Sequence, residues 1–278
     1  MAQNLQQATQ APLVMRLAHR VEDVEFKPGS LVFVIGEFFP PFEKNPTCIY
    51  VYVNMSLLYR VRWHRLVSPR ALIWMYTKRR WFMSKLGCFD MVLDFYRPQS
   101  RIMMRKLATH PVVVRHFLVG TACQARGQLQ DLDRCKWDVC VVGAVSPRRK
   151  RLYARLRDSG CTLSPLETDD FKSVIVQSRI VLNVHYAWCD TFEVPRIIEA
   201  FANGTCVVTE PCYAMSELVP SNCYVCATYG EIVEQVRSLL NHPDQISRVG
   251  SAAARYYREE YDVNSRQGYQ DILEAIPK

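Results

Sequence analysis

The 278-residue sequence lacks any unbroken apolar run of the ~18–20 residues that a membrane-spanning helix needs. Its first twenty residues lack the basic start and apolar core of a secretory signal. Without such a signal, the eleven irregularly spaced cysteines are expected to be reduced thiols rather than a disulfide framework. These absences predict a soluble, cytoplasmic protein with no transmembrane segment.

Acidic residues are missing from one long stretch of the chain. Between Asn45 and Phe89 there are eight Lys and Arg residues and no Asp or Glu, and these eight account for the whole net charge of +8. Basic and aromatic side chains together favour contact with nucleic acid or with an anionic membrane surface. The competing interpretation is a solvated basic surface over a core of aromatic side chains, with Trp74 and Tyr76 in an expected strand.

Short apolar runs alternate with segments of helical periodicity along the whole chain, as buried parallel strands and their covering helices do. In the first half, strands are expected at 31–35, 48–53, 71–76, 91–95 and 112–114, and helices at 78–86 and 99–107. In the second half, strands are expected at 139–142, 180–184, 206–209 and 224–227, and helices at 148–157, 169–177, 194–203, 231–240, 243–259 and 264–276.

This alternation predicts an α/β protein with parallel sheets and helices on both faces. The polar stretch 121–136 separates the two regions of strands and helices, so we expect two Rossmann-like domains. The N-terminal domain is placed at residues 1–125 and the C-terminal domain, with its closing helices, at residues 126–278.

The segment WDVCVVGAVSPRRKRLY, residues 137–153, combines a buried strand, Gly143 at its exit and a basic helix start. Glycine lets a ligand approach the backbone, and the first turn of a helix presents N–H groups that attract anions. Arg148, Arg149 and Lys150 add cations that suit a diphosphate. Cations at a helix N-terminus are unfavourable without an anion, which favours this interpretation over a solvated helix face.

The segment IVLNVHYAWCDTFEVPRIIEAFANGTCVVTE, residues 180–210, places His185 and Tyr186 at the carboxyl end of a strand, where α/β proteins bind ligands. The following helix region carries Glu193, Arg196 and Glu199 at a spacing that brings them to neighbouring positions. Carboxylates placed in this way suit the hydroxyls of a ribose or sugar, while a surface ladder of charges explains the same spacing equally well.

Several other chemistries are not indicated. The dinucleotide fingerprint Gly-x-Gly-x-x-Gly and the Walker loop are both absent. The pair Cys223 and Cys226 has redox spacing but falls on an expected strand, which favours a structural role. No set of Cys and His completes a zinc site, so no essential metal or other cofactor is expected.

With these motifs, the second half resembles the nucleotide-sugar-binding domain of GT-B glycosyltransferases. The resemblance rests on the order DVCVVGAVSPRR, LNVHY and FEVPRIIEAFANGTCVVTE, followed by a strand and three helices. It implies that Glu199 binds the donor ribose. It also implies that Arg148, Arg149 and Lys150 hold the diphosphate and that Glu193 and Arg196 lie near the phosphates and sugar.

The chain departs from the family at one position of interest. Many retaining members carry two glutamates eight residues apart, and Thr191 stands eight residues before Glu199. Glu193 is closer to a variant of that pattern, so the stereochemistry stays open. For a catalytic base, the first half offers Glu37, directly after a strand, with His64, Asp94 and His116 as further candidates.

We therefore expect two Rossmann-like domains that face each other across a cleft, with a hexose or pentose passed from a UDP- or GDP-sugar to an acceptor hydroxyl. The expected catalytic residues are Glu37 and Glu193. The expected substrate-binding residues are Gly143, Arg148, Arg149, Lys150, His185, Tyr186, Thr191, Arg196 and Glu199. A glycan or glycoprotein is the expected acceptor. The alternatives are modified DNA bases as acceptor, with nucleic acid bound at 45–89, or an inactive GT-B-like protein that binds nucleic acid or nucleotides.

Overall fold

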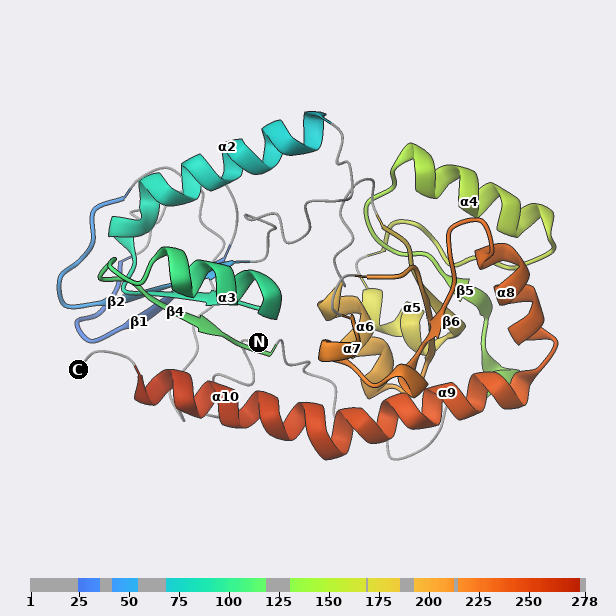
Figure 1. Ribbon diagram of the computed structural model, residues 1–278. Coiled ribbons are helices and arrows are strands. Elements are labelled where there is room, and N and C mark those ends of the chain that lie inside the picture. The colour runs from blue at the N-terminus through green and yellow to red at the C-terminus, as the bar shows by residue number, and fades with distance from the viewer. Residues whose placement is uncertain are drawn as a thin grey trace. The chain divides into compact units, whose positions relative to one another are not determined.

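The computed structural model describes residues 25–35, 42–54, 69–118, 131–168, 170–185, 193–212 and 215–275 (Figure 1). The chain divides into two compact units, one of residues 1–118 with 265–278 and one of residues 119–264. The sequence-based division differs from these units in giving residues 265–278 to the C-terminal domain. They join the first unit because Tyr269 and Ile272 are buried, and because the Ser265 hydroxyl donates to the Leu118 carbonyl at 3.2 Å.

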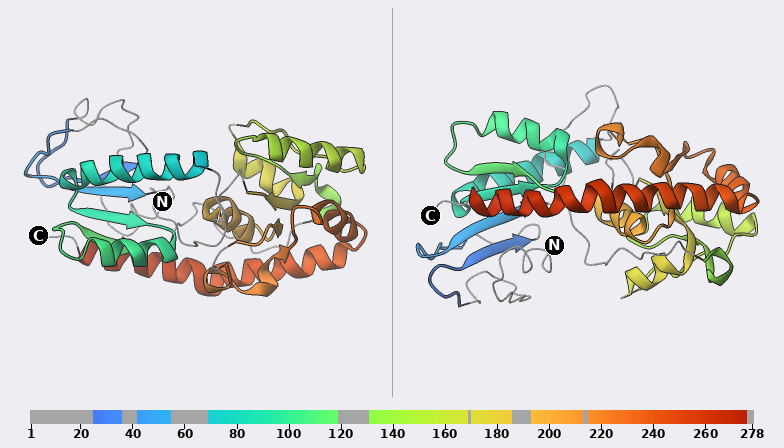
Figure 2. Two further views of the ribbon diagram at one scale, coloured as in Figure 1. Left: turned by 45° about the horizontal axis from the view of Figure 1, so that its top comes forward. Right: turned by 90° about the horizontal axis from the view of Figure 1, so that it is seen from below.

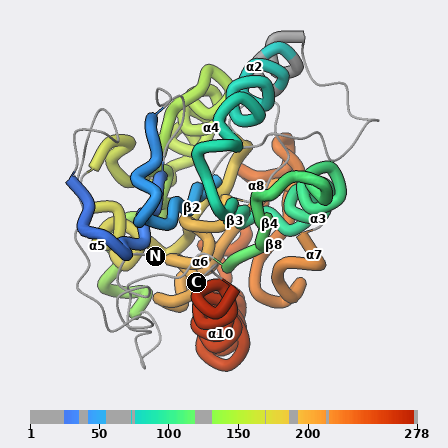
Figure 3. The backbone as a smooth tube through the Cα atoms, turned by 90° about the vertical axis from the view of Figure 1, so that its left-hand side faces the viewer, coloured from blue at the N-terminus to red at the C-terminus, as the bar shows by residue number. Residues whose placement is uncertain are grey.

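The first unit contains a parallel four-stranded sheet in the order β1-β2-β3-β4. Its strands are β1 (Leu31–Ile35), β2 (Ile49–Asn54), β3 (Met91–Asp94) and β4 (Val113–His116). The helix α2 (Pro69–Lys85), with the 3-10 turn η2 (Leu86–Cys88), joins β2 to β3, and α3 (Arg97–Lys106) joins β3 to β4. Right-handed connections that step the same way across a sheet lie on one face. Figure 3 shows α2 and α3 on one side of the strands and α10 (Asp262–Glu274) on the other.

The strand expected at residues 71–76 is wrong, because these residues form part of α2. A short apolar run can form either a buried strand or a buried segment of a helix, and its pattern alone does not distinguish the two. The helical periodicity seen from residue 78 begins earlier than expected, at Pro69, and proline suits the first turn. The other strands expected in the first half are confirmed, with ends that differ by one or two residues.

The second unit contains a parallel sheet in the order β5-β6-β7-β8. Its strands are β5 (Trp137–Cys140), β6 (Ser178–Asn183), β7 (Cys206–Thr209) and β8 (Val225–Cys226). Its other elements are η3 (Leu132–Arg134), α4 (Pro147–Asp158), α5 (Phe171–Val176), α6 (Val194–Ala202), α7 (Met215–Leu218), η4 (Ser221–Cys223), α8 (Ile232–Leu240), α9 (Pro243–Tyr256) and the π-helical η5 (Tyr257–Tyr261).

The chain reverses its direction across this sheet at β5. Val139 pairs with Ile180 of β6 on one side and forms a parallel bridge with Leu163 on the other. The connection through α4 therefore steps away from β6, whereas the connections through α5 and α6 step towards β7. Right-handed crossovers in opposite directions lie on opposite faces, so the sheet is covered on both sides.

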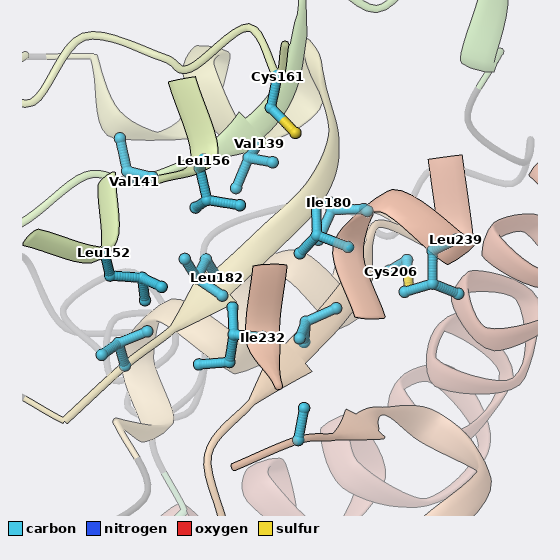
Figure 4. Close-up of a cluster of buried hydrophobic side chains, with 14 of the residues drawn as sticks. Val139, Val141, Leu152, Leu156, Cys161, Ile180, Leu182, Cys206, Ile232 and Leu239 are labelled. Carbon is cyan, nitrogen blue, oxygen red and sulfur yellow. The ribbon is translucent and has the colours of Figure 1, made fainter. Parts of the chain in front are cut away.

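The core on the α4 side explains why these segments form strands and helices as they do. Val139, Ile180 and Leu182 point from the sheet towards Leu152 and Leu156 of α4, and α8 closes the same cluster (Figure 4). The alternate strand residues Val181 and Val207 are also buried, on the opposite face. Burial on both faces requires the continuous apolar runs seen in the sequence, and each such side chain contributes ~1.5–3 kcal/mol.

Both units can be followed in two further views (Figure 2). Within the part of the chain that the structure describes, no helix combines the length and the apolar character needed to cross a bilayer.

Candidate functional site

The point of reversal between β5 and β6 lies at the carboxyl ends of two strands whose following helices cover opposite faces. Open α/β sheets bind their ligands at such a point. The loop after β5, residues 141–146, enters α4, where the Ser146 hydroxyl accepts the backbone N–H of Arg149 at 3.2 Å and so caps the helix. Two sequence-predicted segments therefore meet at one edge of the sheet.

Arg149 ties the two strand ends together. Its side chain is only 2% exposed, although it is a long cation on a surface helix. Nη1 donates to the Ala144 carbonyl at 2.8 Å, in the loop after β5, and Nε donates to the Val184 carbonyl at 2.9 Å, just after β6. Nη2 donates to the Val184 carbonyl and to Glu193 Oε1, each at 2.5 Å. Arg149 therefore links the loop after β5 to the end of β6 and to Glu193.

Glu193 joins a second arginine to the first. It stands at the N-cap of α6, and while Oε1 accepts from Arg149, Oε2 pairs with Nη2 of Arg196 at 2.7 Å. The Arg196 guanidinium lies against Gly143, whose φ is +112°. A Cβ at Gly143 would lie 2.5 Å from Arg196 Nη2, so this approach requires glycine. Gly143, Arg149, Glu193 and Arg196 form one group, called here the arginine pair site.

A second group lies beside the first and centres on Arg148. Its guanidinium makes a two-pronged ion pair with Glu210, with Nη1 2.6 Å from Oε2, and it lies 3.9 Å above the Tyr229 ring. Glu210 is 4% exposed and also accepts the backbone N–H of His185 at 2.8 Å. The His185 carbonyl in turn accepts from Arg148 Nη1 at 3.1 Å. The hydrogen bond with Glu210 is the main cause that raises the pKa of Arg148.

The remaining predicted residues fall in different places. Lys150 is exposed on α4, outside the contacts of both groups, and the ring Nε2 of His185 lies 3.1 Å from the Pro211 carbonyl. Glu199 is 5% exposed on α6, one turn after Arg196, and its carbonyl accepts Asn203 Nδ2 at 2.8 Å. The candidates Glu37, His64, Tyr186 and Thr191 lie outside the described residues.

The net charge of the arginine pair site differs from that of the group around Arg148. Arg148 and Glu210 neutralise each other, whereas Arg149 and Arg196 share the single carboxylate of Glu193. Among the described side chains, the arginine pair site therefore has one net positive charge. The first turn of α6 adds backbone N–H groups at the positive end of the helix dipole. This arrangement suits an anion that carries several oxygen acceptors.

Two residues of the site were missed by the sequence reasoning. Glu210 directly follows β7, so the argument that selected His185 from the end of β6 would have selected Glu210 as well. Tyr229 precedes α8 in a turn, and its position over Arg148 depends on how α8 packs against α4, for which the sequence holds no local signal.

The first unit also gathers polar residues at the carboxyl edge of its sheet. Asn54, Asp94 and His116 end three neighbouring strands in register. Asp94 is fully buried and accepts from Asn54 Nδ2 at 3.2 Å and from the Ser100 hydroxyl at 3.1 Å. Burial raises its pKa to about 7 against the effect of these donors. Burial, with the charge of Arg97, lowers the pKa of His116 to about 4, so this imidazole is neutral at pH 7.

Among the described residues, no group of three or more His, Cys, Asp and Glu side chains could hold a metal ion. Burial raises the pKa of Cys223 to about 11, which is opposite to what a reactive thiolate requires.

Comparisons with known proteins identify the family and the fold of the chain. A family model described as glycosyl transferase-like matches residues 124–274, which is more than half of the chain. No match was found among the curated proteins. Among solved structures, a sucrose-phosphate synthase from Thermosynechococcus elongatus is similar, with a TM-score of 0.54 and 13% identity over 83% of this chain and 69% of that one.

Two further solved structures are similar to a comparable degree. TarM of S. aureus, in complex with fondaparinux, alpha-GlcNAc-glycerol and UDP, has a TM-score of 0.57 and 13% identity, over 83% of this chain and 51% of TarM. HepE of Anabaena, in complex with UDP-glucose, has a TM-score of 0.54 and 14% identity over 82% and 73%. The chain therefore spans between half and three quarters of these relatives. It belongs to the glycosyl transferase-like family and has the GT-B fold.

Proposed function

We propose that the chain binds a nucleoside-diphosphate sugar at the carboxyl ends of β5 and β6 and transfers the sugar to an acceptor hydroxyl. One observation carries this proposal. Among the described residues, two arginines from different helices share one carboxylate at the reversal point of the sheet, and the three side chains together carry one positive charge where α/β proteins bind phosphates. The structures of TarM in complex with UDP and of HepE in complex with UDP-glucose support the same class of donor for this chain.

In this proposal, Arg196 contacts the diphosphate, together with the N–H groups at the start of α6. Its guanidinium is 11% exposed and bound to one oxygen of Glu193, and it has donors left for phosphate oxygens. The bond that breaks leaves negative charge on the nucleoside diphosphate, so a fixed cation there lowers the barrier more than it strengthens substrate binding.

Arg149 and Glu193 act as positioning residues in this proposal. The Arg149 side chain is occupied by two backbone carbonyls and by Glu193, so it fixes the distance between the two strand ends. Both oxygens of Glu193 accept from guanidinium groups, which suits a residue that orients the arginines rather than one that takes up a proton.

The remaining roles follow from the family resemblance and stay proposals. Glu199 would bind the ribose hydroxyls from the next turn of α6. A glycan or glycoprotein hydroxyl would be the acceptor, with Glu37 as the base that removes its proton. The proposed reaction uses no metal ion, because the arginines supply the positive charge at the diphosphate.

A panel of UDP-, GDP- and ADP-sugars tests the donor by thermal shift, followed by hydrolysis of the best binder. We expect one nucleotide class to raise the Tm, since a ligand that binds only the folded state stabilises it by mass action. Arg196→Gln is expected to remove the shift. The matched control is Arg151→Gln, on the exposed face of α4. No shift with any nucleotide sugar would reject the proposal.

A further inference from the structure

The helix α2 turns a row of exposed side chains away from its sheet. The residues of this row recur at intervals of three and four, which places them along one side of the helix, and they are Ile73, Tyr76, Thr77, Arg80, Met83 and Ser84. Ile73 is 64% exposed, Tyr76 66% and Met83 42%, which is unusual for large apolar side chains on one helix face. The inner side of α2 packs through Phe82, which is fully buried.

The two hydroxyl groups of this row have hydrogen-bond partners within the helix. The Thr77 hydroxyl donates to the Ile73 carbonyl at 2.9 Å, and the Ser84 hydroxyl donates to the Trp81 carbonyl at 2.7 Å. Because these hydroxyls are already bonded within the helix, covering the row with an apolar medium leaves neither of them without a partner. The row then presents apolar surface around the cation of Arg80.

The next helix, α3, lies on the same face of the sheet as α2 (Figure 3) and also has exposed basic and apolar side chains. Its exposed residues again follow helical spacing and include Arg97, Arg101, Met104 and Arg105. Neither α2 nor α3 contains a single Asp or Glu. The acidic residues beside β3 are turned inward or paired, since Asp94 is buried and Asp90 is bonded to Lys44 at 2.5 Å. We call the outer sides of the two helices the α2–α3 face.

We infer that the α2–α3 face docks onto the surface of an anionic lipid bilayer. Arginines that reach the lipid phosphates, with Ile, Met and Tyr side chains between them, form the pattern that lies in a membrane interface. Nucleic acid would use the arginines, but it gains little from Ile73, Met83 and Met104, because aliphatic side chains do not stack on bases as aromatic ones do. The docking is peripheral, since no described helix can cross a bilayer.

Co-sedimentation of the full chain with lipid vesicles tests this inference. We expect binding to vesicles of phosphatidylcholine with about a third phosphatidylglycerol, weaker binding to phosphatidylcholine alone, and a decline as salt is added. Arg80→Glu should lower the partition coefficient on the order of tenfold, because it reverses a charge at the lipid surface. The double variant Ile73→Ser and Met83→Ser should lower it several-fold even where salt is low.

Matched controls lie on exposed positions of the other helices. Arg248→Glu on α9 makes the same charge reversal, and Val263→Ser on α10 removes an exposed apolar side chain that is 57% exposed. Both should bind vesicles as the unaltered protein does, and an unchanged Tm shows that each variant is folded. Absence of vesicle binding, equal loss in the controls, or binding to duplex DNA without binding to vesicles would each overturn the inference.

Discussion

The guanidinium of Arg196 occupies the space that a side chain at position 143 would fill. Its Nη2 lies 2.5 Å from the point where a Cβ on Gly143 would stand, and the backbone there has a φ of +112°. The glycine after β5 therefore leaves room for the arginine in the first turn of α6, although the two residues are 53 positions apart in the sequence.

Gly143→Ala should consequently destabilise the fold and displace Arg196. We expect a loss of ~1–3 kcal/mol in the free energy of unfolding, because an L-residue is strained at this φ and its Cβ meets the guanidinium. Urea denaturation measures the loss. Gly87→Ala is the control, since nothing lies within 4 Å of a Cβ at that glycine. An equal effect in both variants would show that Gly143 has no special fit to Arg196.

Arg149→Met should destabilise the second unit strongly. Methionine keeps most of the volume, but it leaves the Val184 and Ala144 carbonyls and the Glu193 carboxylate without their buried partner. The expected loss is about 3–5 kcal/mol by chemical denaturation, compared with a few tenths for Arg151→Met on the exposed face of the same helix. A small loss at Arg149 would mean that the two strand ends do not depend on it.

Arg148 and Glu210 should show strong energetic coupling. A double-mutant cycle with Arg148→Met and Glu210→Gln is expected to yield about 1.5–3 kcal/mol, because the pair is two-pronged and Glu210 is buried. The control cycle pairs Arg148→Met with Glu234→Gln, an exposed residue of α8. Additive effects in the first cycle would contradict the ion pair.

His116 should make the fold less stable as the pH falls. Its pKa is about 4 when folded, below the 6.5 of an ordinary histidine, so the unfolded chain takes up the proton first and stability is lost from about pH 6.5 towards 4. Asp94, with its pKa raised to about 7, opposes this trend, because stability from that group declines as the pH rises from about 4 to 7.

The two trends are separated by comparing the protein with His116→Gln, which removes only the first. Between pH 7 and pH 5, the unaltered protein should lose on the order of 1–2 kcal/mol relative to the variant. Parallel pH profiles of the two proteins would show that His116 does not titrate as its burial requires.

Much of the fold follows from local pattern. The apolar runs 139–142, 180–182 and 206–208 overlap β5, β6 and β7, and they are unbroken because these strands are covered on both faces, so their length and composition identified them. The run at residues 71–76 misled for the same reason. An apolar segment of that length satisfies both a strand and a helix, and only its continuation into residues 78–85 decides between them.

The sequence singled out the two segments that meet at the carboxyl ends of β5 and β6, but not how their side chains pair. Arg148 and Arg149 were expected near a diphosphate because they lie at a helix start, and Arg196 because of the family resemblance. Which of them is buried depends on contacts between distant segments, such as Arg149 with Val184 and Arg148 with Glu210. Tertiary packing determines such pairings, and the periodicity and spacing of residues in the sequence carry no information about it.

The central claim is that the arginine pair site binds the diphosphate of a sugar donor. Calorimetric titration with UDP and GDP measures this directly on the unaltered protein, on Arg196→Gln and on the control Arg151→Gln. We expect one diphosphate to bind, with an affinity that Arg196→Gln weakens at least about tenfold and the control leaves unchanged, because the variant loses a charge-assisted hydrogen bond. Equal affinity of the unaltered protein and Arg196→Gln, or no binding of either diphosphate, would contradict it.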